Sequence, residues 1–394
     1  MNSTEEDLCA RYIEASAALQ RGDLDGARRG FDLLLMDAPR FAAAWDGRGS
    51  CHAAEGDLKR AGECFQKAIR LERNNWRSRY NWGVALHRAG ELREACKWLR
   101  AACKLAPGER VVHYRLGSCH SDLGEYEQAL RCYHRALEQP EREVTDAELY
   151  LHIGNAEGER GEFEAAEKAY ERACLFSPDD PMVFYNWATL SARQGDLESA
   201  ERLALRARAL DPRSLRCALL WFHLALDNGA WEAAETRIAE LGRLAGSDRL
   251  STALRAELAR RVGNREAARS LAMEALVMEG PPSDHAVDRA LATLRELRGL
   301  SVPCHGFRLL VGVDCGAETY FRPYVVLAQT EEQARWFVAE LQDALDPSPW
   351  RIVESESFPH EGEAVAGVYH LLLTRVLFPH EDCSFVDPEH AAWR

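Results

Sequence analysis

The chain has 394 residues, of which 46% are hydrophobic, so it is long enough for two or three domains with sizeable cores. Its formal net charge of −14 argues against a nucleic-acid-binding protein, because such proteins gain most of their affinity by neutralising phosphates. The acidic N-terminus does not resemble a signal peptide, and the longest apolar run, residues 217–226, is too short to cross a membrane, so we expect a cytoplasmic protein.

A six-residue motif recurs along the first three quarters of the chain. It begins with glycine and ends with alanine, as in GELREA at 90–95, and its eight copies start 34, 34, 34, 37, 34, 34 and 34 residues apart. Such a period indicates a solenoid of helical repeats, in which no repeat buries its apolar face alone. The repeats are 8–41, 42–75, 76–109, 110–143, 147–180, 181–214, 215–248 and 249–282, with an insertion of Val144 to Asp146 after the fourth.

Small residues recur at two places in every repeat, where they allow two helices to approach closely. The twentieth place always holds alanine: Ala27, Ala61, Ala95, Ala129, Ala166, Ala200, Ala234 and Ala268. The eighth place holds Ala15, Gly49, Gly83, Gly117, Gly154, Ala188, Phe222 and Ala256, so the seventh repeat departs most from the pattern. The motif glycine is expected to adopt a positive φ in the turn between the helices. Large side chains such as Phe65, Leu99, Tyr133 and Tyr170 are expected to fill the space between them.

The period and these small residues resemble the tetratricopeptide repeat. The resemblance covers residues 8–282 and implies an all-α superhelical solenoid of helix-turn-helix repeats, with residues 1–7 as a tail. It also implies that the first helix of each repeat lines a concave groove, in which an extended segment of a partner protein lies. We expect helix pairs to begin near Trp45, Trp76, Arg110, Ala147 and Pro181, and no strand within the repeats.

The resemblance further implies which places of the first helices face the groove. In the third to sixth repeats these places hold the predicted partner-binding residues Arg77, Tyr80, Asn81, Arg88, Tyr114, Arg115, His152, Asn155, Tyr185, Asn186 and Arg193. The lysine and asparagine clamp with which some members hold a C-terminal carboxylate is absent, because its places hold Tyr12, Ser16, Asp46 and Ser50. We therefore expect a partner segment with acidic and aromatic side chains, bound by arginine and tyrosine.

The composition changes after the repeats. Residues 284–299 form an amphipathic pattern typical of a helix that caps a solenoid, so 283–299 is assigned to a capping helix. Residues 300–394 carry 6 basic and 15 acidic side chains and are predicted to form a small α+β domain docked on the end of the solenoid. Its expected strands are 307–314, 323–328, 350–358 and 367–378, and its expected helix is 330–345.

Catalytic and metal sites are not predicted, although two constellations can be drawn. Twelve cysteines occur without a CxxC pair, mostly at small or apolar places of the repeats, where free cysteine packs as a hydrophobe. A metal could be drawn between His360, His380, Cys383 and His390, and a nucleophile pair between Cys315 and His305 or His360. Neither spacing matches an established ligand or catalytic pattern, so we expect no cofactor and no enzyme.

Three functions remain open at this point. The leading interpretation is a scaffold or adaptor that binds a protein or peptide segment in the groove, without nucleic acid or membrane insertion. A second is an enzyme or effector domain at 300–394 that the repeats deliver to a target. A third is an inhibitor or immunity-type protein whose acidic C-terminal domain covers a basic partner. The 44 arginines against five lysines are typical of a GC-rich bacterial genome.

Overall fold

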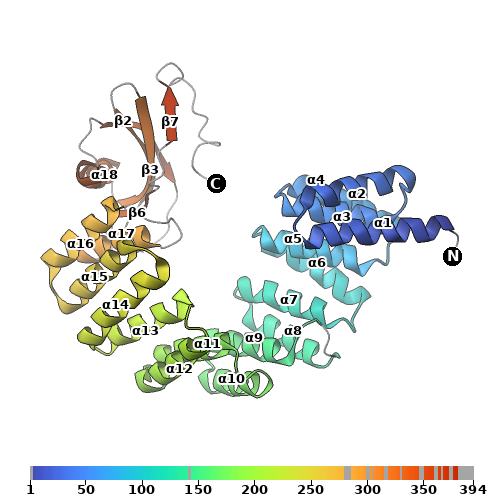
Figure 1. Ribbon diagram of the computed structural model, residues 1–394, viewed down its shortest axis with the longest axis horizontal. Coiled ribbons are helices and arrows are strands. Elements are labelled where there is room, and N and C mark those ends of the chain that lie inside the picture. The colour runs from blue at the N-terminus through green and yellow to red at the C-terminus, as the bar shows by residue number, and fades with distance from the viewer. Residues whose placement is uncertain are drawn as a thin grey trace. The chain divides into compact units, whose positions relative to one another are not determined.

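The computed structural model describes residues 3–140, 143–278, 285–298, 302–303, 305–314, 318–328, 331–345, 350–358, 363–364, 367–371 and 376–379 (Figure 1). The chain divides into two compact parts, Met1–Gln194 and Gly195–Arg394, here called the N-terminal half and the C-terminal half. Each half is described by itself.

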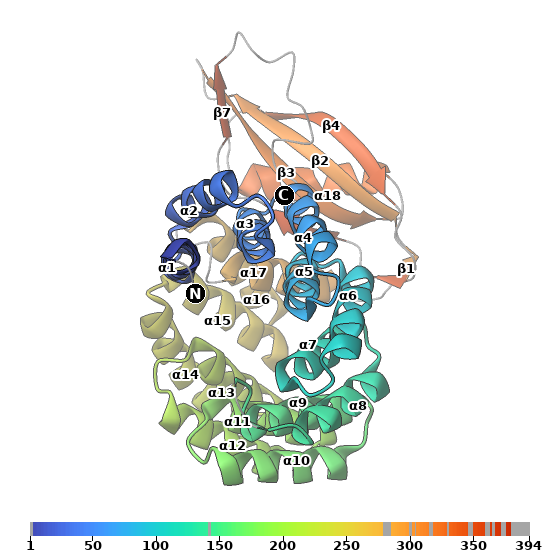
Figure 2. The same cartoon turned by 90° about the vertical axis from the view of Figure 1, so that its right-hand side faces the viewer.

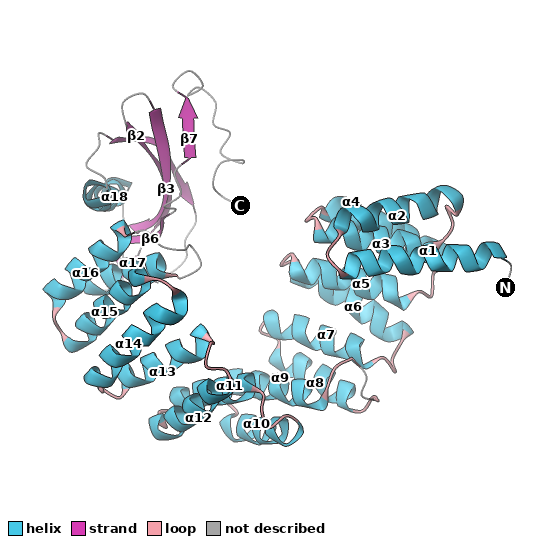
Figure 3. Ribbon diagram, viewed as in Figure 1, coloured by secondary structure: helices cyan, strands magenta, loops and turns pink. Residues whose placement is uncertain are grey.

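Sixteen helices make up the eight repeats, in pairs of a first and a second helix, and no strand occurs in the described residues of 3–278 (Figure 3). The odd-numbered helices are the first helices: α1 Ser3–Gln20, α3 Ala42–Ala54, α5 Trp76–Arg88, α7 Arg110–Asp122, α9 Asp146–Glu159, α11 Pro181–Gln194, α13 Leu215–Asp227 and α15 Asp248–Val262. The even-numbered helices are the second helices: α2 Leu24–Asp37, α4 Leu58–Leu71, α6 Leu92–Leu105, α8 Tyr126–Leu137, α10 Phe163–Phe176, α12 Leu197–Leu210, α14 Trp231–Ala245 and α16 Arg265–Val277.

The predicted repeat pattern is confirmed, with small shifts at its edges. The predicted helix starts agree to within three residues, the largest difference being α3, which begins at Ala42 instead of Trp45. The first helix begins at Ser3, so most of the expected tail is helical. Phe222 is fully buried in α13, and the seventh repeat keeps the register of the others despite its large residue at the eighth place.

The turn glycines and the buried small residues explain why each repeat forms a helix pair. All eight motif glycines have φ between 67° and 91°, as in Gly124 at 75°, where a side chain would be strained. All eight twentieth-place alanines are fully buried. At the eighth place, a methyl group added to Gly117 would lie 2.6 Å from a ring carbon of Tyr133, sixteen residues later in the repeat. Glycine at this place therefore makes room for a large side chain of the second helix.

The three inserted residues after the fourth repeat lead into α9, which begins at the last of them, Asp146. Thr145 caps the helix: its hydroxyl accepts a hydrogen bond from the backbone of Glu148 at 3.1 Å, and the Glu148 carboxylate accepts one from the Thr145 backbone at 2.8 Å. Asp146 forms an ion pair with the buried guanidinium of Arg110, and Val144 is buried. The insertion thus supplies both a cap and a charge that ties it to the fourth repeat.

Most described cysteines pack as small apolar residues, as expected. Six of the nine described cysteines are buried and only Cys9 is exposed. The Sγ atoms of Cys96 and Cys119 lie 2.8 Å apart, and the hydrogen bond between them lowers the pKa of the Cys96 thiol. The repeat pattern did not indicate this pair, because the two residues belong to adjacent repeats.

The C-terminal half adds a capping helix and a sheet to the last repeats. The capping helix α17 covers Ala286–Arg298, and the helix α18 covers Glu331–Leu345. The strands are β1 Val302–Pro303, β2 His305–Asp314, β3 Glu318–Ala328, β4 Trp350–Phe358, β5 Glu363–Ala364, β6 Gly367–Leu371 and β7 Val376–Pro379. All described pairings are antiparallel, in the order β4-β2-β3-β6 with β7 also on β3, and β1 pairs separately with β5 (Figure 2).

Two strand predictions are wrong in detail. The expected strand 367–378 is two strands, β6 and β7, which both pair with β3. Pro323 was expected to start a strand but lies inside β3, opposite Leu310 of β2. The described pairing of β3 with β7 ends at Phe321 and that with β6 begins at Tyr324, so Pro323 lies between these two ladders. A missing backbone N–H is tolerated at such a gap.

One continuous apolar core joins the last repeats to this sheet. It includes Phe222 of α13, Leu276 of α16, Leu291 of α17, Val326 of β3 and Phe337 of α18. The expected docking of the C-terminal domain on the end of the solenoid is therefore found within this half. In the N-terminal half, the core is divided into four smaller clusters along the repeats.

Candidate functional site

The first helices of the N-terminal half form a continuous layer. Helix α3 contacts α5, α5 contacts α7, α7 contacts α9 and α9 contacts α11, while each second helix packs on its own first helix and on the first helix of the next repeat. The surface of α3, α5, α7, α9 and α11 that carries the predicted groove residues is here called the first-helix face. The predicted partner-binding residues come from the last four of these helices.

A row of polar contacts along the first-helix face joins each repeat to the next. Asn81 donates to Asp46 at 2.7 Å, and the His87 ring nitrogen lies 2.7 Å from an Asp122 oxygen. Farther along, the Tyr114 hydroxyl lies 2.9 Å from Nε2 of His152. The last junction has two contacts: Asn186 donates to Asn155 at 3.0 Å, and Arg193 forms an ion pair with Glu159. Each contact fixes the orientation of one first helix on its neighbour.

Six of the eleven predicted residues take part in this row: Asn81, Tyr114, His152, Asn155, Asn186 and Arg193. Their partners Asp46 and Glu159 were not predicted, nor was the pair of His87 with Asp122. These contacts could have been predicted from the acidic residues at the fifth place (Asp46) and the thirteenth place (Asp122 and Glu159) of a repeat, because both places face the adjacent repeat.

The remaining predicted residues include three arginines that differ from Arg193. Arg77 and Arg88 are exposed and Arg115 is half-buried, and none of the three forms an ion pair with another described residue. The guanidinium carbon of Arg77 lies 5.1 Å from the ring centroid of Trp76, and that of Arg115 lies 5.3 Å from the ring centroid of Tyr114. These cation–π contacts orient the arginines, and the charge of Arg77 also acts on the buried carboxylate of Asp46 without forming an ion pair with it.

Aromatic side chains accompany these arginines. The half-buried Tyr80 meets the Trp76 ring edge to face, with centroids 6.1 Å apart, and Tyr185 is also half-buried. Burial raises the pKa of Tyr114, so its hydroxyl stays protonated. The Tyr114 ring also packs against the His152 ring, with 5.2 Å between the ring centroids. The first-helix face therefore combines fixed aromatic rings with guanidinium groups that form no ion pair among the described residues.

Burial also sets the charge of His152. It lowers the pKa of His152 below its ordinary value of 6.5; the charge of Arg115 acts in the same direction, while Glu148 and Asp122 oppose it. A neutral imidazole can accept the hydrogen bond of the Tyr114 hydroxyl. Because the folded-state pKa is lowered, the stability that neutral His152 contributes is present above pH 6.5 and is lost as the pH falls.

We therefore expect His152→Gln to reduce the pH dependence of stability. The unfolded state takes up a proton at residue 152 in mild acid only in the wild type, so the wild type loses more stability there than the variant does. Denaturant unfolding between neutral pH and pH ~5 would measure the difference. His134→Gln, at an exposed position of α8, is the control and should leave the pH profile unchanged. Parallel profiles of wild type and His152→Gln would contradict this role.

The alternative sites of the C-terminal region are not described. Cys315, His360, His380, Cys383 and His390 lie outside the described residues, and the side chain of His305 is also outside them. Within the residues that are described, no group of three or more histidine, cysteine or acidic side chains is arranged to hold a metal ion. None of the described helices combines the length and apolar character that a membrane span needs.

Comparison with known proteins agrees with the repeat architecture. Models described as tetratricopeptide repeat match residues 42–75, 111–139 and 151–214. The chain is 32% identical over 102 residues to mouse DnaJ homolog subfamily C member 7. The aligned segment covers 26% of this chain and 21% of that protein. It is 28% identical over 113 residues to tetratricopeptide repeat-containing protein trd-1 of Caenorhabditis elegans, covering 29% of this chain and 15% of the relative. The matched segment is thus a small part of both relatives.

A solved structure extends the likeness over more of the chain. The crystal structure of a tetratricopeptide repeat protein from Parabacteroides merdae superposes with a TM-score of 0.50 at 20% identity, covering 64% of this chain and 98% of that one. At this identity the likeness concerns the fold alone. The repeat period, the turn glycines, the buried alanines and the matching repeat models identify the chain as a tetratricopeptide repeat protein.

Proposed function

We propose that this chain is a non-catalytic interaction scaffold, whose first-helix face binds an extended segment of a protein partner. Tetratricopeptide repeats support a protein-interaction role in general. The observation that carries the finer proposal is the set of arginines Arg77, Arg88 and Arg115, which have no ion pair among the described residues although the chain has a net charge of −14. A chain rich in carboxylates could readily neutralise them within the fold.

The chemistry of this face favours acidic and aromatic side chains in the partner. A guanidinium group binds a carboxylate through two parallel hydrogen bonds, and its affinity rises when water is excluded. Half-buried tyrosines such as Tyr80 and Tyr185 offer a large contact area with little loss of side-chain entropy. The polar row between repeats keeps the first helices in fixed positions, so less order is lost on binding.

Replacing Arg77 and Arg115 together by alanine is expected to weaken partner binding by ~2–4 kcal/mol, if both guanidinium groups are enclosed by the partner. Thermal stability should change little, because neither side chain forms an ion pair within the described fold. The partner segment can be selected from a library of extended peptides rich in acidic and aromatic residues. Calorimetry with the tightest peptide then gives the affinities of wild type and variant.

The matched control removes two charges from the second helices. Arg60→Ala with Arg93→Ala changes exposed arginines of α4 and α6 and should leave the peptide affinity unchanged. If the Arg77 and Arg115 double variant binds as tightly as the wild type, the first-helix face is not the binding surface. An equal loss in both double variants would indicate general charge attraction instead of a site.

We also propose a role for the C-terminal sheet. The C-terminal sheet caps the last repeats and provides a second surface for binding or tethering, with a large excess of acidic residues after residue 300. We place the protein in the cytoplasm and assign it no nucleic-acid partner, given its acidic character. No catalytic role is proposed for either half.

A further inference from the structure

A hollow lies on the opposite side of the first-helix layer, between two second helices. It has a volume of about 460 Å³ and is bounded by α6, α7 and α8. Its buried floor includes His113, Leu116, His120 and Cys132. The size is that of a small-molecule site. We call it the α7 hollow.

Four cationic side chains form the rim of the α7 hollow. Arg100 and Lys104 come from α6, and Arg131 and Arg135 come from α8. All four are exposed, and none forms an ion pair with another residue in the part of the chain that the structure describes. The lining contains no carboxylate. Four positive charges around one small cavity repel one another, so an anion bound there would relieve the repulsion.

The positive charges of α6 and α8 both act on the thiol of Cys132 at the floor of the α7 hollow. Burial raises the pKa of the Cys132 thiol on the floor, while the positive charges of Arg135, Arg100 and Arg131 oppose this shift. Arg100 belongs to α6 and the other two belong to α8, so positive charge reaches the floor from both sides. Arg100, Arg131 and Arg135 also line this one cavity, together with Lys104.

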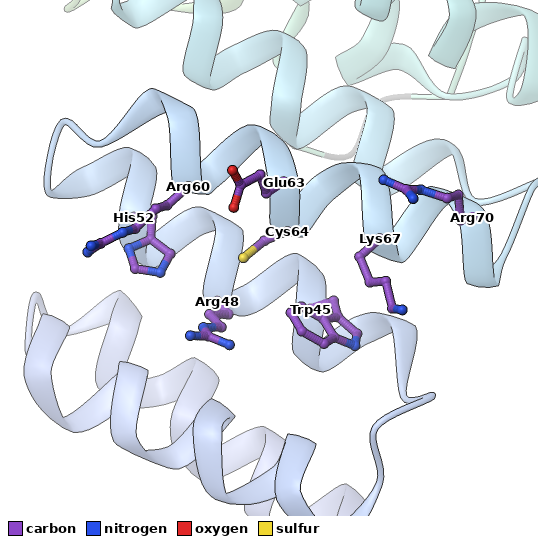
Figure 4. A pocket seen from close by; sticks show the side chains of 8 residues that line it. All are labelled: Trp45, Arg48, His52, Arg60, Glu63, Cys64, Lys67 and Arg70. Atoms are coloured by element: carbon purple, nitrogen blue, oxygen red, sulfur yellow. The ribbon is translucent and has the colours of Figure 1, made fainter.

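The equivalent hollow two repeats earlier differs in carrying a carboxylate in its lining. It has a volume of about 370 Å³, lies over α3 and is lined by corresponding places of the second repeat, and here it is called the α3 hollow (Figure 4). Glu63 of the α3 hollow and Arg131 of the α7 hollow occupy the same place of their repeats, sixty-eight residues apart. Arg48 pairs with Asp32 at 3.1 Å, and Arg60 pairs with a further carboxylate. Lys67 and Arg70 have no ion pair among the described residues, so this hollow is partly neutralised, and no cation reaches it from the preceding second helix, α2.

We propose that the α7 hollow binds a small phosphate-bearing anion. Arginine forks hold phosphate oxygens in pairs, and a phosphate group has enough oxygens to meet cations from α6 and α8 at once. A single carboxylate carries one negative charge and two oxygens, so it balances fewer of the four cations than a phosphate group does. The apolar floor at Leu116 and Cys132 leaves room for the organic part of a phosphate ester. This site is separate from the first-helix face and does not depend on the partner proposed for it.

Calorimetry of the full-length protein with inorganic pyrophosphate and with phenyl phosphate tests the site. The wild type is expected to bind both anions at low salt. Arg100→Gln with Arg135→Gln removes one cation from each side and should weaken binding by ~30-fold or more, since each charged hydrogen bond contributes more than a neutral one. Both side chains are exposed, so the variant should keep the thermal stability of the wild type.

Two comparisons make the result specific. Arg60→Gln with Arg70→Gln removes the same charge from the α3 hollow and should leave the affinity for pyrophosphate within twofold of the wild type. Arg77→Ala with Arg115→Ala on the first-helix face should also leave it unchanged. The proposal is overturned if the wild type binds neither anion, or if both hollow variants lose affinity equally. Tighter binding of an aspartate-rich peptide, with the same dependence on Arg100 and Arg135, would also overturn it in favour of a peptide site.

Discussion

Deletion of residues 300–394 is expected to lower the stability of α16 and α17 by about 3–6 kcal/mol, the effect of exposing two leucine-sized side chains. Leu276 of α16 and Leu291 of α17 share one apolar core with Val326 of β3 and Phe337 of α18. Helix α17 contacts β6, and α16 contacts α18, so the deletion uncovers one face of both helices. Amide hydrogen exchange should show faster exchange in α16 and α17 and no change in α3 to α10.

A point variant in the full-length chain separates loss of packing from other effects of truncation. Phe337→Asp places a charge where the side chain is only 3% exposed, and it should produce the same pattern of exchange. Glu332→Ala on the same helix is exposed and is the control. Unchanged exchange in α16 and α17 after both the deletion and Phe337→Asp would show that the sheet does not stabilise the last repeats.

Gly117→Ala is expected to destabilise the fourth repeat by ~1–3 kcal/mol, although alanine is the better helix former by ~1 kcal/mol. The added methyl group would lie 2.6 Å and 2.7 Å from two ring carbons of Tyr133, which is fully buried and cannot move aside without disturbing α8. Overpacking therefore outweighs helix propensity. Thermal and denaturant unfolding of the purified variant measure the loss.

The sign of this effect should reverse when the ring is removed. In a Tyr133→Ala background, Gly117→Ala should stabilise the protein, because the methyl group then enters a cavity and the helix propensity remains. Gly108→Ala, in the turn between α6 and α7, is the control for an added methyl group without overpacking, since it would meet only one atom, at 3.8 Å. A stabilising Gly117→Ala in the wild-type background would mean that the eighth place is not restricted by packing.

The sequence predicted the helix pairs well because their packing is local. A glycine such as Gly124 and an alanine such as Ala129 lie within one repeat, and the contacts they permit are made within that repeat. The spacing therefore carries the information directly. The same argument explains why Phe222 did not displace the register of α13, since Ala234 and the turn at Gly229 are retained.

Contacts between repeats were not predictable in the same way. Whether Asn186 meets Asn155 or faces a partner depends on the rotation of one helix pair on the next, and small angular differences move a side chain by several ångströms. The pairing of Asp46 with Asn81 has the same origin. In the sheet, the position of Pro323 between two ladders depends on which strands flank β3, and the local pattern does not contain that information.

The order of the strands has a consequence for synthesis on the ribosome. The repeats of the N-terminal half make their contacts with close neighbours in sequence, so each can fold soon after it emerges. Strand β3 is different, because Glu318 to Phe321 pair with Val376 to Pro379, more than fifty residues later in the sequence. That ladder cannot form until residues 376–379 have left the ribosome. Helices α16 and α17 pack on α18 and β6, so their apolar face stays uncovered until those elements have also emerged, and chaperones can protect it during that interval.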